Sequence, residues 1–267
     1  MLRESDTKVV RGVRLRKDPA REPCFKVVDT DAEMMAWPDM SMQSRRERLH
    51  RHMNNELNSL DIAAQCLADF PEADWDLRMQ LARQCWDESR HVMGLYRRLT
   101  EIGGHKGEFP VSNFEWSVSC YLDSLIGRLT LQNRTFEAGA MDLLAQLPAQ
   151  WRDAGDPDTA ELLESIAADE VQHVRFANQW IRKMVSEDPR RLMQVAQAIR
   201  FLTAVNAALM PQAGEVNVVG ESTENMIGVP AVNVEDRELA GFTPEEIAEI
   251  VRQAGFRSVV PKSQAQA

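Results

Sequence analysis

Two histidines in the sequence each follow a glutamate by three residues. His91 follows Glu88 in the run DESRH, and His173 follows Glu170 in the run DEVQH. On a helix this spacing places the carboxylate and the imidazole on one face, about one turn apart. Such oxygen and nitrogen ligands suit iron or manganese better than a metal that prefers thiolates. A single pair of this kind is more often an ordinary surface pair, so the motif gains meaning from its context.

Two further glutamates turn the motifs into an ordered repeat. Glu56 precedes Glu88 by 32 residues, and Glu137 precedes Glu170 by 33 residues. A glutamate from each of two helices, with an E-x-x-H motif from each of two others, is the ligand set of helical bundles that hold two metal ions. The repeat therefore predicts six metal ligands, namely Glu56, Glu88, His91, Glu137, Glu170 and His173.

The glutamates are expected on the buried faces of their helices. Around Glu88, apolar side chains recur at intervals of three and four residues, which leaves position 88 on the inward face. Four buried carboxylates would repel one another strongly unless positive charge lies among them. Two divalent cations would balance four glutamates. We therefore predict two iron ions, or a mixed iron/manganese pair, as the cofactor.

An aspartate precedes each E-x-x-H glutamate. These residues are Asp87 and Asp169. In a metal site such a carboxylate accepts a hydrogen bond from the N–H of a ligand histidine, which fixes the tautomer of the imidazole and raises its basicity. We predict this supporting role for both aspartates, and no catalytic residue beyond the metal site.

Long segments with few glycines or prolines must position these ligands. Between residues 41 and 210 they are separated by FPEAD, GGHKGEFP and AGDPD, which are strong helix breakers. We predict an all-α protein with a four-helix bundle and an extra helix over 41–210. An irregular N-terminal arm occupies 1–40, and a C-terminal extension occupies 211–267.

The C-terminal extension is expected to begin as loop or short strands and to end in a short helix. Thr243 fits the N-cap of that helix, Pro244 its first residue and Glu246 a capping box, while Gly255 fits its end.

The length of one connection predicts a break in the third bundle segment. If the second and third helices run parallel, the chain must return along the bundle after Gly103. Gly103 lies about 22 Å past Glu88, and a helix continuous from Val111 would start about 39 Å on the other side of the metals. Residues 104–110 reach only about 25 Å and cannot span that distance. A helix continuous from 111 to 145 is therefore excluded in that topology, and we predict a break between about Val111 and Ser124.

Composition narrows the class of protein. The chain has 267 residues, is 44% hydrophobic and 27% charged, and has no apolar run near the roughly 20 residues of a membrane span. Its charged N-terminus does not resemble a secretory signal, so we predict a cytoplasmic protein with no membrane partner. The net charge of −10 disfavours nucleic acid as a partner. The four cysteines form no C-x-x-C pair, which argues against a zinc ribbon or a redox dithiol.

Other aromatic side chains are expected to serve packing or the surface. We interpret five tryptophans as packing anchors and three histidines outside the motifs as surface residues: Trp75, Trp86, Trp116, Trp151 and Trp180, and His50, His52 and His105.

The segments that carry the ligands resemble a known superfamily. The stretches HMNNELNSLDIAAQCLADFP, LARQCWDESRHVMGLYRRL, RLTLQNRTFEAGAMDLL and AADEVQHVRFANQWI resemble the ferritin-like superfamily, and more closely a bacterial ferritin-like family known as a domain of unknown function. The resemblance covers about residues 41–185 and implies a di-iron fold without implying a substrate. DESRH also looks like the D/E-E-x-R-H motif of soluble desaturases and amine oxygenases, whereas DEVQH lacks the arginine.

Two functions fit this resemblance. The first is an oxygen-activating oxidase, monooxygenase or desaturase that uses dioxygen on a small organic substrate, with electrons from a ferredoxin or a flavin reductase. The alternative is a ferroxidase or iron-binding protein of the bacterioferritin kind, without an organic substrate. Segments 1–40 and 211–267 favour the enzyme, because storage shells are built from compact bundles and these additions look like a lid or substrate wall. The oligomeric state is left open.

Overall fold

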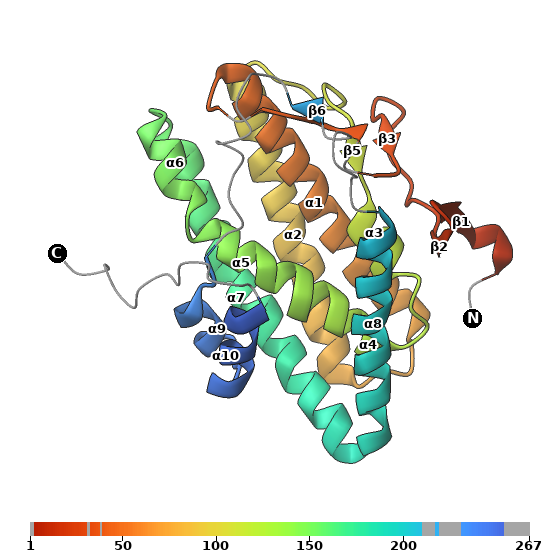
Figure 1. The fold of residues 1–267 in the computed structure, drawn as a ribbon. Helices are drawn as coiled ribbons and strands as arrows, with labels where there is room; N and C mark the ends of the chain where they lie inside the picture. The colour runs from red at the N-terminus through yellow and green to blue at the C-terminus, as the bar shows by residue number, and fades with distance from the viewer. Residues whose placement is uncertain (1–2, 31–32, 38, 210–216, 219–230, 254–267) are drawn as a thin grey trace. The chain divides into compact units, whose positions relative to one another are not determined.

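The protein is mostly helical (Figure 1). The computed structural model describes residues 3–30, 33–37, 39–209, 217–218 and 231–253. The chain divides into two compact units, Met1–Gln132 with Arg190–Met226, and Asn133–Pro189 with Ile227–Ala267. The predicted helical class is confirmed. The predicted bundle segment, 41–210, contributes helices to both units.

Short strands order the N-terminal arm of the first unit. A 3₁₀ turn, Glu4–Asp6, leads into the antiparallel strands β1 (Thr7–Val10) and β2 (Val13–Arg16), joined through a turn in which Gly12 has a φ of 83°. Strand β3 (Val27–Val28) pairs in parallel with β5 (Val111–Ser112), and β4 (Met35–Ala36) pairs in parallel with β6 (Asn217–Val218). These pairings tie the predicted arm to later parts of the same unit.

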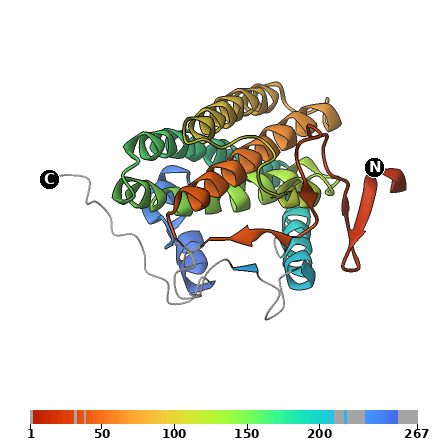
Figure 2. The same cartoon turned by 90° about the horizontal axis from the view of Figure 1, so that it is seen from above.

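Helices α1 (Met42–Asp69) and α2 (Trp75–Glu101) lie side by side in both views (Figures 1 and 2). Ser41 caps α1 by accepting a hydrogen bond from the Ser44 N–H, and Asp74 caps α2 in the same way at Asp76. Because only 70–74 join the helices, they form a helical hairpin. Their facing sides are apolar and buried, with Leu49, Met53, Ile62, Leu77, Leu81, Leu95 and Leu99 among the core residues.

The predicted break after Val111 is confirmed. After β5, a short helix α3 (Phe114–Ser119) ends before Cys120, and helix α4 (Leu125–Leu131) begins only after the Ser124 cap. Helix α3 packs against α1. Trp116 on α3 donates its indole N–H to the Lys17 carbonyl over 2.8 Å, which fixes the crossover to the N-terminal arm.

Helix α8 (Leu192–Leu209) of the first unit packs on α4, and its buried residues are Ala198, Leu202, Val205 and Leu209. Together with the 3₁₀ turn Pro189–Arg191, it is long and apolar enough to cross a membrane by length and composition, with a mean hydropathy of 1.2 and 22% of the segment buried. It is the one helix among the described residues to pass that test, and one such helix is weak evidence for a span.

The second unit begins with a change of helix type. A π-helical stretch, Gln132–Glu137, carries α4 into α5 (Ala138–Leu144), which is followed by α6 (Leu147–Asp153) and the long α7 (Pro157–Glu187). Asp156 caps α7 at the Thr159 N–H, and Pro157 is its first residue.

Two short helices, not one, follow in the C-terminal extension. Helix α10 (Pro244–Gln253) starts with the predicted capping box, because Thr243 and Glu246 each accept a hydrogen bond from the other's backbone N–H. Gly255 lies outside the described residues. Helix α9 (Val234–Leu239) was not predicted, since its run VEDREL has no helical apolar period. It is held by a buried ion pair between Arg237 and Asp142 at 2.7 Å.

The core of the second unit joins these helices to α5 and α7. It is built from Ala138, Met141, Val171, Val174, Ala240, Phe242 and Ile247. The C-terminal extension therefore packs on the helices that carry Glu137 and Glu170.

Candidate metal centre

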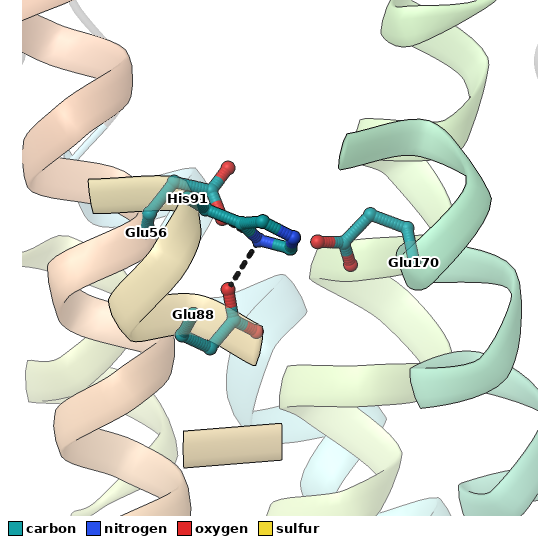
Figure 3. Close-up of side chains that lie close together, drawn as sticks. All are labelled: Glu56, Glu88, His91 and Glu170. Carbon is teal, nitrogen blue, oxygen red and sulfur yellow. Dashed lines mark hydrogen bonds and ion pairs between the residues drawn. The ribbon is translucent and has the colours of Figure 1, made fainter. Parts of the chain in front are cut away.

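The first unit brings three of the predicted ligands together. Glu56 from α1 and Glu88 and His91 from α2 offer ligand atoms that all lie within 4.8 Å of one another, and all three side chains are buried. His91 Nδ1 is 3.1 Å from Glu56 Oε2 and 3.0 Å from Glu88 Oε2, as Figure 3 shows for the second contact. We call these residues the first half-site.

Protonation of the first half-site reflects the close approach of its groups. Burial opposes the charged form of His91, but the hydrogen bonds to Glu56 and Glu88 outweigh it and raise the pKa of His91 to about 11. Burial likewise opposes ionisation of Glu56, yet its contacts with His52 and His91 hold the pKa of Glu56 well below its ordinary value. Glu56 and Glu88 thus favour positive charge at His91, and a bound metal ion would displace the proton of that imidazole.

Two polar side chains hold the carboxylates of the first half-site from outside. His52 Nε2 lies 2.7 Å from Glu56 Oε1, and Gln84 donates a hydrogen bond to Glu88 Oε1 over 3.3 Å. The interpretation of His52 as a surface residue is therefore wrong. Because side chains on a helix lean toward its N-terminus, a residue four positions before a glutamate is well placed to reach it.

The second unit brings the other three predicted ligands together. Glu137, Glu170 and His173 offer ligand atoms within 4.8 Å of one another, and all are buried. His173 Nδ1 lies 3.5 Å from Glu170 Oε2 on α7, where Figure 3 also draws Glu170. We call these residues the second half-site.

A π-helical turn sets the position of Glu137 in the second half-site. Glu137 is the last residue of that turn, and π turns inside α-helices occur frequently at functional sites. Asn133, in the same turn, donates a hydrogen bond to Glu137 Oε2 over 2.8 Å and lies 3.5 Å from the His173 carbonyl. Asn133 thus holds Glu137 as Gln84 holds Glu88, from four positions earlier.

The predicted supporting aspartates lie beside the half-sites. Asp87 is buried and accepts hydrogen bonds from Arg83 over 2.9 Å and Arg90 over 2.6 Å, so its charge is balanced on α2. Asp169 on α7 is half-buried. Their role as acceptors for ligand histidines stays a prediction.

The two half-sites have the same donor set, two carboxylates and one imidazole. These buried Glu and His groups could hold a metal ion. Oxygen and nitrogen donors without a thiolate fit iron or manganese, and a carboxylate pair with one imidazole provides the negative charge that a divalent cation needs.

Several remaining predictions on aromatic residues and histidines can be compared with the structure. His105 is exposed, as predicted, but His50 is fully buried. Its Nε2 accepts a hydrogen bond from the Gly107 N–H over 2.9 Å, and the rings of Phe25 and Phe109 lie 5.6 and 5.8 Å away. The pattern of apolar residues did not indicate the burial of His50, because its partners come from two distant loops.

The tryptophans divide into two groups. Trp116, Trp151 and Trp180 are buried, which confirms them as packing anchors. The same interpretation is wrong for Trp75 and Trp86, whose side chains are 71% and 64% exposed on α2.

The chain belongs to a family described as a protein of unknown function, DUF455, whose model matches residues 2–248. No curated protein and no solved structure matches the chain.

Proposed function

We propose that this member of the DUF455 family is a di-iron or mixed iron/manganese carboxylate protein, with a ferritin-like four-helix bundle, that activates dioxygen to oxidise a small organic substrate. The observation that supports it most is the repetition of one donor set, two carboxylates and an imidazole, in two buried half-sites. One half-site alone would be compatible with a buried ion pair. Two such sites in a repeated order favour a pair of metal ions.

Charge supports one divalent cation for each half-site. Glu56 and Glu88 together carry two negative charges, and so do Glu137 and Glu170, so two cations bring the set to neutrality. Three donors per half-site are fewer than the six that iron commonly takes, which leaves positions for water, dioxygen or substrate. We propose that each half-site holds one of the two metal ions.

The chain would supply ligation, orientation and exclusion of water. Gln84 and Asn133 hold the carboxylates of Glu88 and Glu137 through hydrogen bonds, so those oxygens have fewer orientations open to them. Burial of all six ligands keeps bulk water from the centre. When bound, an iron pair supplies electrons to dioxygen, and an external donor such as a ferredoxin or a flavin reductase restores them.

The number of irons bound per chain distinguishes the proposed enzyme from an iron-storage protein. Anaerobic titration of the purified full chain with ferrous iron should saturate near two ions per chain. After admission of air and gel filtration, about two irons should remain on a small species. Tens of irons co-eluting with a large assembly would establish the ferroxidase alternative, and absence of iron or manganese binding would refute the metal centre. His105→Ala, at an exposed histidine, serves as the control variant.

A further inference from the structure

The outer side of α2 carries a regular stripe of side chains, most of them exposed. Its last residue, Tyr96, is half-buried, with the Lys106 ammonium 5.4 Å from the centre of its ring. Counting from Trp75, the residues follow at steps of four and three. We call this stripe the outer seam: Trp75, Met79, Ala82, Trp86, Ser89, Met93 and Tyr96. It lies opposite the face that packs on α1, where Leu77, Leu81, Leu95 and Leu99 are buried.

Large apolar side chains on the outer seam face solvent. Trp75 is 71% exposed, Trp86 64% and Met93 63%, and Met79 is also exposed. The two tryptophans alone offer about 300 Å² of ring surface, at ~150–250 Å² for a whole aromatic side chain. A standard interface takes about 800 Å² from each partner, so the seam is a substantial part of one. Exposed patches of this kind mark interaction sites.

From this seam we infer that two copies of the chain pair through α2, antiparallel and about a two-fold axis. The seven-residue repeat is the spacing by which one helix packs along another. It runs through three repeats on α2, which is long enough to specify a helical partner. The inference is independent of the metal centre, because Glu88 and His91 lie on the inner side of α2.

The sizes of the side chains favour a second copy as the partner. With the axis between positions 87 and 88, Trp86 of one copy faces Ser89 of the other, and Met93 faces Ala82. Each of these layers joins a large side chain to a small one, which is how facing helices fill space. A parallel pair would instead place Trp86 against Trp86 and Ala82 against Ala82, leaving layers of unequal thickness.

Charges beside the outer seam fit the same arrangement. Antiparallel pairing about this axis brings Asp76 of one copy near Arg97 of the other, at both ends of the interface. It also brings Arg83 near Arg90 at the centre, but both arginines are already paired with Asp87, at 2.9 and 2.6 Å. One Asp87 in each copy offsets half of the arginine charge at the centre. At the ends Asp76 attracts Arg97, which also pairs with Glu101 of its own chain at 2.9 Å.

Molar mass in solution tests the pairing. Light scattering on the full chain should give twice the 30.3 kDa of one chain at micromolar concentration. Trp86→Glu and Met93→Glu should each yield a monomer with an unchanged helical circular dichroism spectrum, because each places charge in the seam. Met193→Glu is the matched control, since Met193 is a methionine of equal exposure, 64%, on α8. It should remain dimeric.

Disulfide trapping tests the direction of the pair. In a Cys24→Ser background, which removes an exposed thiol, a mixture of Ala82→Cys and Met93→Cys chains should cross-link to each other on mild oxidation. Neither variant should cross-link to itself. Self-linking of each variant would overturn the antiparallel arrangement. A wild-type monomer at all concentrations, or a dimer that survives both Trp86→Glu and Met93→Glu, would overturn the interface and leave the seam to another partner.

Discussion

His52 lies one helical turn before Glu56 on α1, and its Nε2 is 2.7 Å from Glu56 Oε1. The same four-residue offset joins Gln84 to Glu88 and Asn133 to Glu137. Three of the four helical segments that carry a half-site glutamate thus place a polar contact for it one turn earlier. At the fourth, the equivalent position is Ile166, which is buried in the core.

Replacement of His52 should weaken metal binding without abolishing it. His52→Ala removes the group that orients Glu56, and loss of such an outer contact typically costs ~10 to 100-fold in metal affinity. His52→Gln should keep most of the affinity, because an amide can still donate to the carboxylate, as Gln84 does to Glu88. Competition with a chelator for ferrous or manganous ion measures the change. An affinity of His52→Ala equal to that of the exposed-histidine variant His105→Ala would show that the contact is irrelevant.

Sequence reasoning located the buried glutamates and histidines of the half-sites because they repeat along the chain. The E-x-x-H spacing and the paired 32- and 33-residue intervals identified all six residues of the half-sites. The break before α4 followed from the reach of a short connection. The contacts of His52, Gln84 and Asn133 could also have been inferred, since each lies four residues before a glutamate. That offset is common on helices, and only knowledge of which glutamates are buried gives it weight.

Features that depend on distant partners could not be inferred. His50 is buried by Phe25 and Phe109, which come from loops on either side of the α1–α2 hairpin in sequence. Trp75 and Trp86 are exposed because no other described element packs on their side of α2. An amphipathic sequence pattern does not show which faces of a helix are covered. Helix α9 depends on the contact of Arg237 with Asp142, which are 95 residues apart.

Removal of one ligand imidazole should affect metal content and leave the fold intact. His91→Ala and His173→Ala each delete a donor. A buried glutamate that loses its imidazole partner can take up a proton, so both variants should remain helical by circular dichroism. Metal content measured by mass spectrometry should fall from about two ions per chain to one or fewer in each variant. If both variants kept the wild-type content, the assignment of both half-sites would be wrong.

A buried arginine should anchor the N-terminal arm to α1. Arg21 donates hydrogen bonds to Asp61 over 2.6 Å and Asn58 over 2.8 Å, and its side chain is almost fully buried. Arg21→Ala should lower the free energy of unfolding by about 1–3 kcal/mol, since hydrogen bonds to charged groups contribute about that much. Urea denaturation measures the loss, and the arm should become more sensitive to limited proteolysis.

The control for Arg21 lies in the same arm. Arg14 is half exposed and lies 3.6 Å from the exposed Glu4, so Arg14→Ala should change stability by less than about 0.5 kcal/mol. Equal losses from both variants would mean that the Arg21 contacts are no stronger than those of an ordinary surface pair.

Acid should destabilise the protein through His50. Burial lowers the pKa of His50 to about 4, whereas an unfolded histidine has a pKa near 6.5. Because the unfolded state takes up the proton first, the free energy of unfolding should decrease as the pH falls from about 6.5 to about 4. The contribution of His50 over this interval is about 3 kcal/mol, at ~1.4 kcal/mol per unit of pKa difference. Above pH 7 it should have no effect.

Comparison with His50→Gln isolates this contribution from that of the acidic residues. A glutamine carbonyl can accept the hydrogen bond from the Gly107 N–H that His50 Nε2 now accepts, and it carries no titratable proton. The variant should still be less stable than wild type at pH 7, because it loses the ring contacts with Phe25 and Phe109. The stability advantage of wild type over His50→Gln should decrease by about 3 kcal/mol as the pH falls to 4. The difference in unfolding free energy between wild type and His105→Gln should not change with pH in this way. Urea denaturation curves for the three proteins at pH 7, 5.5 and 4 measure it, and parallel losses in all three would mean that His50 is not the group that takes up the proton.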